Sequence, residues 1–271
     1  GGTIDGGSGG IISFDSPVTV SNAGIVAGYG TFGEGTELDG GGGITNLAGG
    51  TISGQSEAIV AFNTAIAVNN YGRIAAYGTN ARAIYFSAGG GITNQAGGTV
   101  GSAYNAIVAF NSAISVVNAG LITAYGANGK AIDLIEGGSV TNQAGGTITG
   151  YLGIYSRFAG MTVVNAGTIV GTGGTGARFA AGYTNLLTID PGAVFAGTVD
   201  GGNTIDATAV STLELAPGAS AGTLSGLGIQ FINFDQTTID PGAYWVLDGA
   251  NTLAAGTTLT NTGTLALTDA T

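Results

Sequence analysis

Short runs of apolar and β-branched residues, bounded by glycine and asparagine, recur along the whole chain. One stretch contains three such runs: Ile44–Asn46, Thr51–Ser53 and Ile59–Phe62. The runs lack the spacing of three and four residues that marks an amphipathic helix, and short runs of β-forming residues between turn residues are typical of strands. The pattern therefore predicts three short strands in each repeating unit.

The units recur at a fixed distance along the chain. The decapeptide Gly91–Val100 closely matches Gly43–Ile52 and Ser139–Ile148, each 48 residues away, and a shorter variant lies midway between them. A period of 20–50 residues is typical of a solenoid. With three strands per period, stacked at roughly 4.8 Å on their counterparts, we expect an all-β fold: a right-handed parallel β-helix with three sheets, about 24 residues per coil and about eleven coils.

One asparagine occupies the same place in each unit, 24 residues from the next, or 23 in the last case. Its amide can bond the backbone at a tight bend and can also pair with the amide of the neighbouring coil. We therefore predict a structural ladder rather than a ligand site, with adjacent glycines supplying unusual backbone angles. The members are Asn22, Asn46, Asn70, Asn94, Asn118, Asn142 and Asn165.

Two sets of aromatic residues recur every 48 positions. Because phenylalanine is usually buried, we expect the first set to form a structural ladder, with the ring at the same interior level or corner of alternate coils, rather than a surface that grips a sugar. For the tyrosines, which are flanked by glycine, an interior row and an exposed row both fit. The sets are Phe14, Phe62, Phe110 and Phe158, and Tyr29, Tyr77 and Tyr125.

The bends change after about residue 170. Residues 1–170 are predicted to be regular β-helix with 48-residue double-coil repeats, and residues 171–271 a continuing β-helix with Pro-Gly-Ala bends, all in one elongated domain. Proline followed by glycine fits the centre of a type II turn. The bends are Asp190–Ala193, Ala216–Ala219 and Asp240–Ala243. The chain opens inside a repeat and stops without a polar cap, which predicts a segment of a longer or processed protein, or a partner on the last coil.

Composition excludes several classes of function. The net charge is −11 and only 8% of residues are charged, which argues against binding to nucleic acid or anionic lipid. With 44% hydrophobic residues the chain is expected to be ordered. Its 54 glycines lack the triplet period of collagen, and the absence of cysteine excludes a disulfide framework.

Candidate catalytic groups are sparse. The sequence has no histidine or cysteine, and its five basic residues are scattered. The one compact mixed-charge cluster comprises Lys130, Asp133 and Glu136, which we interpret as a surface ion pair rather than an acid pair for polysaccharide cleavage. No glycine-rich run is followed by Lys-Ser or Lys-Thr, as a phosphate loop requires. We predict no enzyme activity and no cofactor.

The sequence offers two further candidate binding sites. Glu34–Asp39 places three carboxylates in six residues, which suits Ca²⁺, but the spacing matches no established calcium loop and a solvated acidic bend is the expectation. An ice-binding array would need regular threonines. Thr45, Thr93 and Thr141 recur, but Ser21, Asn69 and Val117 interrupt them at alternate coils.

The repeat strings resemble the passenger domains of bacterial autotransporters. The resemblance rests on Ile92–Val100, Val163–Ile169 and Ser211–Leu224 and covers most of the chain. It implies export across the outer membrane through a C-terminal β-barrel of the same precursor, and display outside the bacterial cell.

We therefore expect a non-enzymatic extracellular protein of the bacterial surface. A stiff solenoid passenger would act in adhesion to other cells or abiotic surfaces, or in end-to-end or lateral association with copies of itself, including as the subunit of a filament. A β-helix enzyme that degrades polysaccharide and an inert stalk are the alternatives.

Overall fold

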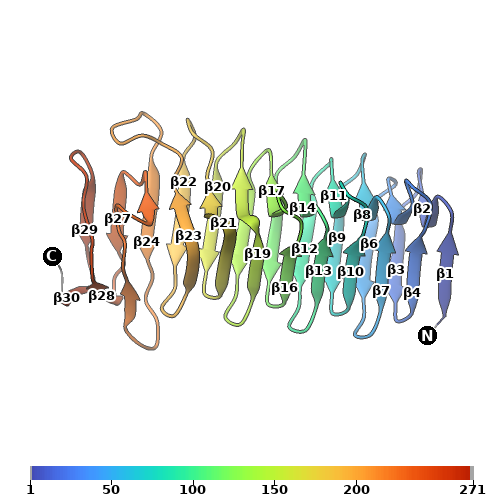
Figure 1. Ribbon diagram of the computed structural model, residues 1–271, viewed down its shortest axis with the longest axis horizontal. Helices are drawn as coiled ribbons and strands as arrows, with labels where there is room; N and C mark the ends of the chain where they lie inside the picture. The colour runs from blue at the N-terminus through green and yellow to red at the C-terminus, as the bar shows by residue number, and fades with distance from the viewer. Residues whose placement is uncertain (1, 269–271) are drawn as a thin grey trace.

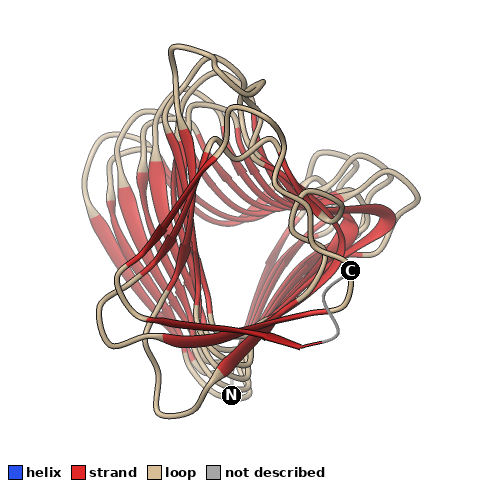
Figure 2. Cartoon of the chain, turned by 90° about the vertical axis from the view of Figure 1, so that its left-hand side faces the viewer, coloured by secondary structure: helices blue, strands red, loops and turns tan. Residues whose placement is uncertain are grey.

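The computed structural model describes residues 2–268, and every regular element within them is a β-strand (Figure 1). The strands are parallel and stack in turns of about 24 residues, which gives about eleven coils. The predicted β-solenoid is thus confirmed. The three strands predicted for each unit correspond to three walls: the chain forms one strand on each wall before it returns above its own start, as the end-on view shows (Figure 2).

The first two walls, face A and face B, belong to one sheet. Face A begins with β1 (Thr3–Gly6), β4 (Ile25–Gly28), β7 (Thr51–Gly54), β10 (Arg73–Ala76), β13 (Thr99–Ser102) and β16 (Leu121–Ala124). Face B begins with β2 (Gly9–Ser13), β5 (Glu34–Leu38), β8 (Glu57–Ala61), β11 (Arg82–Phe86), β14 (Asn105–Ala109) and β17 (Lys130–Leu134). The faces merge where single strands cross both walls, in β19 (Thr147–Ser156), β21 (Thr168–Arg178) and β23 (Val194–Asp200); β26 (Phe231–Ile232) then pairs with β23.

The third wall, face C, is an unbroken sheet of eleven strands. Its members are β3 (Val18–Asn22), β6 (Gly42–Asn46), β9 (Ile66–Asn70), β12 (Gly90–Asn94), β15 (Ile114–Asn118), β18 (Gly138–Asn142), β20 (Met161–Asn165), β22 (Asn185–Ile189), β24 (Ser211–Leu215), β27 (Gln236–Ile239) and β29 (Thr258–Asn261). A separate three-stranded sheet at the C-terminal end contains β25 (Gly222–Leu224), β28 (Tyr244–Asp248) and β30 (Thr264–Thr268).

The interior is built from columns of aliphatic side chains held in register. On face A, Val26, Ile52, Ile74, Val100 and Ile122 lie directly above one another, each no more than 2% exposed. Similar columns on the other faces join them in one continuous core. Because each side chain contacts its equivalents one coil above and below, burial of apolar surface stabilises the stack along its whole length.

The bends between face C and face A occur in a long and a short form. In the long form the amide of Gly98 donates to the carbonyl of Gln95 at 2.8 Å, and Gly97 between them has φ of +83°. In the short form the amide of Gly120 donates to the side-chain oxygen of Asn118 at 3.2 Å. The glycine at the third position of the long bend is therefore required by a positive φ, as in a type II turn.

Two of the three Pro-Gly-Ala bends are the predicted type II turns. The Ala193 amide donates to Asp190 at 3.1 Å and the Ala243 amide to Asp240 at 3.0 Å, with φ of +91° and +79° at the intervening glycines. The prediction is wrong for Ala216–Ala219, where Gly218 has no positive φ. The carbonyl of Ala216 instead accepts a bond of 2.9 Å from Nε1 of the buried Trp245.

Candidate functional site

The bend asparagines form one hydrogen-bonded column. The Nδ2 atom of each donates to the Oδ1 atom of the next at 2.8 Å, from Asn22 through to Asn165. The seven side chains are at most 6% exposed, and Nδ2 atoms within the column also donate to backbone carbonyls. The amides are thus occupied by one another and by the backbone, so the column serves the fold and presents no free groups to a ligand.

The phenylalanines lie at a corner and are exposed, so of the two expected positions the interior one is wrong. Phe14, Phe62, Phe110 and Phe158 are 60%, 41%, 45% and 53% exposed. Phe14, Phe62 and Phe110 directly follow a face B strand, and Phe158 lies two residues after the end of β19. The last residue of β8 (Ala61) and of β14 (Ala109) points inward and is fully buried, so the next side chain points out. The 48-residue period therefore marks a row of exposed rings at one corner.

The tyrosines lie at the surface too, at the corner between face A and face B. Tyr29, Tyr77 and Tyr125 are 64%, 47% and 60% exposed. The Arg73 guanidinium lies 5.4 Å from the Tyr77 ring and donates to its hydroxyl, and the Tyr125 hydroxyl donates to the carbonyl of Ala76 at 3.3 Å. Of the two interpretations of this set, the exposed row is the one that the structure shows.

The acidic segment is a strand rather than a bend. Glu34–Leu38 forms β5, which places Glu34 beside Glu57 of β8. Burial, then the charges of Glu37, Glu57 and Asp39, raise the pKa of Glu34 to about 7. Within residues 2–268, no group of three acidic, histidine or cysteine side chains is arranged to hold a metal ion. The buried Asp39 accepts from the Phe62 amide and from Asn63 instead.

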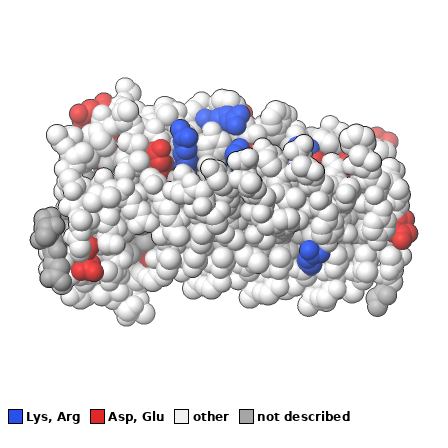
Figure 3. Space-filling model, viewed as in Figure 1, with Lys and Arg blue, Asp and Glu red and all other residues white. Residues whose placement is uncertain are grey.

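Face B collects most of the positive charge of the molecule. Four of the five basic residues lie on its strands or directly after them: Arg82, Lys130, Arg157 and Arg178. In the space-filling view most positive side chains gather along one edge, whereas acidic side chains are scattered, with several near the two ends (Figure 3). The remaining one, Arg73, lies on face A. The basic residues that are scattered in the sequence therefore lie mostly on one wall of the solenoid.

Two basic residues of face B, Arg82 and Lys130, contact acidic side chains, and Arg82 also contacts an aromatic ring. Arg82 donates to Glu57 at 2.8 Å through Nε and lies 3.9 Å from the Tyr85 ring. Lys130 pairs with Asp133 at 2.6 Å, so the predicted ion pair exists, although Asp133 is only 3% exposed. The Oδ1 atom of Asp133 has no hydrogen-bond partner within the described chain.

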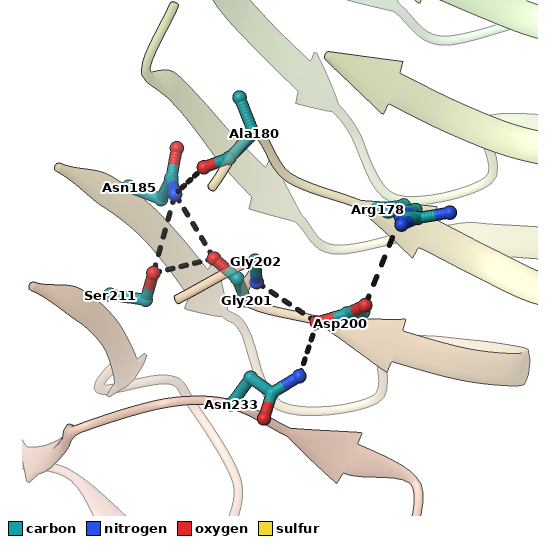
Figure 4. Close-up of polar contacts among 8 residues, drawn as sticks. All are labelled: Arg178, Ala180, Asn185, Asp200, Gly201, Gly202, Ser211 and Asn233. Carbon is teal, nitrogen blue, oxygen red and sulfur yellow. Dashed lines mark hydrogen bonds and ion pairs between the residues drawn. The ribbon is translucent and has the colours of Figure 1, made fainter. Parts of the chain in front are cut away.

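A polar cavity of about 230 Å³ opens at the C-terminal part of this wall. Its lining includes Tyr155, Arg157, Arg178 and Asp200. Arg178 Nε lies 3.9 Å from Asp200 Oδ2, whereas Asp200 Oδ1 accepts from the Gly202 amide at 2.9 Å and from Asn233 at 2.8 Å (Figure 4). Asp200 is thus fixed by groups other than the arginine.

Buried side chains beside the cavity hold its rim in place. Asn185 Nδ2 donates to the carbonyls of Ala180 and Gly201 at 2.9 and 3.0 Å, and Ser211 Oγ also donates to Gly201 (Figure 4). Asn185 and Ser211 are 1% and 0% exposed. The carbonyl of Gly201 is therefore anchored immediately after Asp200, which restricts where that carboxylate can lie.

Sequence reasoning missed this cavity because its residues do not follow the 24-residue count. Asp133, Tyr155, Arg178 and Asp200 are consecutive in one outward column of face B. Their separations are 22, 23 and 22 residues, since β19 and β21 cross from face A to face B without the loop found in other coils. An alignment that allowed for the lost loop would have found the column.

Comparisons of the chain with protein-family models, with curated proteins and with solved structures find no match. Within residues 2–268, no helix exists that is long and apolar enough to cross a membrane. The site must therefore be interpreted from its own chemistry.

Proposed function

We propose that the chain is a non-enzymatic protein of the bacterial cell surface, a rigid β-solenoid that acts by adhesion to other cells or abiotic surfaces. The observation that carries this proposal is the unequal chemistry of its walls. Face B and its edge bear four of the five cations and the row of exposed phenylalanines, whereas the strands of face C bear a single charge, Glu214. Exposed rings and arginines are the residue types that dominate binding energy at interfaces.

Extracellular display is supported by the resemblance of the repeats to autotransporter passengers. Backbone hydrogen bonds between coils and the buried asparagine column oppose local unfolding, which makes the solenoid resistant to the proteases found outside cells. We place the protein outside the cell on these grounds, with other surfaces or copies of itself as partners.

The carboxylates of face B are arranged in a way that favours binding over catalysis. Glu57 is engaged by Arg82, Asp133 by Lys130, and Asp200 by Asn233 and a backbone amide. A catalytic acid and base need to face one substrate bond as a pair, whereas these carboxylates each serve a neighbouring donor. Hydrolysis of a polysaccharide by the purified chain would reinstate the enzyme alternative.

Adhesion is tested by measuring how the purified chain binds arrays of bacterial, plant and animal glycans and coated surfaces. A variant with Phe62→Ser, Phe110→Ser and Phe158→Ser should lose at least tenfold in binding. The same number of changes on face C, Thr45→Ala, Thr93→Ala and Thr141→Ala, should leave binding unchanged. Equal loss in both variants, or no binding by the parent chain, would leave an inert stalk as the better description.

Lateral self-association is a second candidate, favoured by the lack of charge on face C. A shallow groove of about 420 Å³ runs along this wall and is lined by small residues such as Gly43, Ala67 and Gly91. Two copies, each with a net charge of −11, would approach with least repulsion through this wall. Electron microscopy and sedimentation of the parent and of Thr93→Lys test it: isolated rods at high concentration in both would exclude a filament.

A further inference from the structure

We propose that the cavity around Arg157 and Arg178 binds the carboxylate of a hexuronate unit in an acidic oligosaccharide. This inference rests on the proposed adhesive function and names the class of ligand. It starts from the cavity of about 230 Å³ between the coil of β19 and the two coils that follow. The lining of this cavity combines two guanidinium groups, one carboxylate and two aromatic residues, Tyr155 and Phe179.

The two arginines retain free donors. Arg157 has no ion pair within residues 2–268, and its guanidinium lies 5.7 Å from the Tyr155 ring and 5.5 Å from the Phe158 ring. Arg178 is 59% exposed and approaches Asp200 only to 3.9 Å, beyond hydrogen-bonding distance. Arginine presents a planar set of donors that matches a carboxylate in a bidentate manner. Two such groups in one cavity therefore select for a planar anion.

Asp200 argues for a sugar rather than for an acidic peptide. Its carboxylate is fixed at Oδ1 by Gly202 and Asn233, so it remains in the cavity wall when a ligand enters. The side-chain carboxylate of an acidic peptide has no hydroxyl group beside it that could donate to Asp200. A hexuronate carries hydroxyl donors next to its carboxylate, so it can satisfy Arg178 and Asp200 together.

The aromatic rings complete the match. Phe158 is 53% exposed and lies directly beside Arg157, and Tyr155 forms part of the cavity lining. The C–H face of a pyranose is apolar and can pack on such a ring. In a chain of net charge −11 an anion gains nothing from the overall field, so the attraction must be local and should weaken with salt.

The test measures binding of hyaluronan tetrasaccharide, which contains glucuronate, and of chitotetraose, a neutral oligomer of equal length, by calorimetry. The parent chain should bind the acidic oligomer at least tenfold more tightly. Arg157→Ala and Arg178→Ala should each weaken that binding tenfold or more, Arg178→Lys should weaken it less, and none should alter the affinity for chitotetraose.

Arg73→Ala is the matched control, because Arg73 also contacts an exposed tyrosine but lies on face A. Its affinity for both oligomers should equal that of the parent, and circular dichroism should show all variants folded. Equal affinity for acidic and neutral oligomers, unchanged binding in both arginine variants, or equally tight binding of poly-glutamate would overturn the assignment.

The outcome separates this site from the broader proposal. If Arg157→Ala and Arg178→Ala retain full adhesion to glycan-coated surfaces and full affinity for the acidic oligomer, the cavity assignment fails and adhesion stands. If the parent chain binds the free tetrasaccharide but adheres to no surface, the site stands and adhesion fails.

Discussion

The first seven units and the later units of this solenoid turn the same corner with different side chains. Gln95–Gly98 and Asp190–Ala193 are both closed by a bond between their first and last residues, with φ of +83° and +91° at the glycine between. The residue just before the turn is Asn94 in one and Ile189 in the other, each at most 2% exposed. The turn itself therefore does not need the asparagine.

A second position changes together with the first. The last residue of the long bend is glycine wherever the column continues, and alanine in the two long bends where isoleucine has replaced the asparagine, at Ala193 and Ala243. A Cβ on Gly98 would lie 2.6 Å from Asn94 Oδ1 and 2.5 Å from the Asn70 carbonyl. The asparagine column thus requires glycine at the last position of the long bend, because the backbone there lies close to the asparagine side chains. Coils with an aliphatic residue in place of the asparagine can carry alanine at this position.

The C-terminal region depends instead on one large side chain, and its removal should have the largest effect. Trp245 is 1% exposed and donates to Ala216 at the bend that departs from the type II form. Trp245→Ala should lower the free energy of unfolding by about 4 kcal/mol through the cavity it leaves. Urea unfolding followed by circular dichroism measures this. Leu253→Ala, at a side chain that is 47% exposed, is the control, and an equal loss there would contradict the role of Trp245.

Breaking the asparagine column should lower the free energy of unfolding slightly less than Trp245→Ala does. Asn94→Ala removes the acceptor that lies 2.8 Å from the Asn70 amide and the donor that lies 2.8 Å from the Asn118 oxygen, and these buried groups keep only longer bonds to the backbone. We expect a loss of about 3 kcal/mol, since two hydrogen bonds between buried amides are lost and the groups left behind are only partly satisfied. Thermal unfolding compares this variant with Asn111→Ala, whose exposed side chain bonds only Ser87. The column would have no special role if the two variants melted together.

The period predicted the fold well because it records direct stacking, but it did not predict which way the side chains point. Asn46 and Phe62 repeat with equal regularity, yet one is fully buried and the other is 41% exposed. The direction of a side chain depends on its place in the alternation along the strand: Ala61 points inward, so Phe62 points out. The cavity was missed for a related reason: β19 pairs with β21 through a register shift between Gly150 and Leu152, so the side chains that line the cavity depart from the 24-residue count.

The glycines of the long bend offer a sharper comparison within a single turn. Gly98→Ala should cost about 2 kcal/mol, because its methyl group would overlap the backbone and the column. Gly97→Ala should cost about 1 kcal/mol, since the space there is open and the penalty comes only from a positive φ. Melting temperatures of the two variants check the order. A larger loss for Gly97→Ala than for Gly98→Ala would show that the positive φ, rather than packing against the asparagine column, is the main reason for glycine in this bend.

The smallest expected change in stability comes from Glu34 in the N-terminal coils, and it depends on pH. The pKa of Glu34 is raised from 4.5 to about 7 by burial and by neighbouring carboxylates, so the folded state holds this proton more tightly than the unfolded chain. Its contribution to stability is complete below pH 4.5 and is lost as the pH rises through about 7. Glu34→Gln cannot ionise, so it should melt about 2 °C above the parent at pH 8, an effect kept small by solvent screening. The two should approach each other at pH 4.5. Glu136→Gln, outside the acidic group, should track the parent at both values, and a Glu34→Gln advantage that persisted unchanged at low pH would assign the effect to packing rather than to charge.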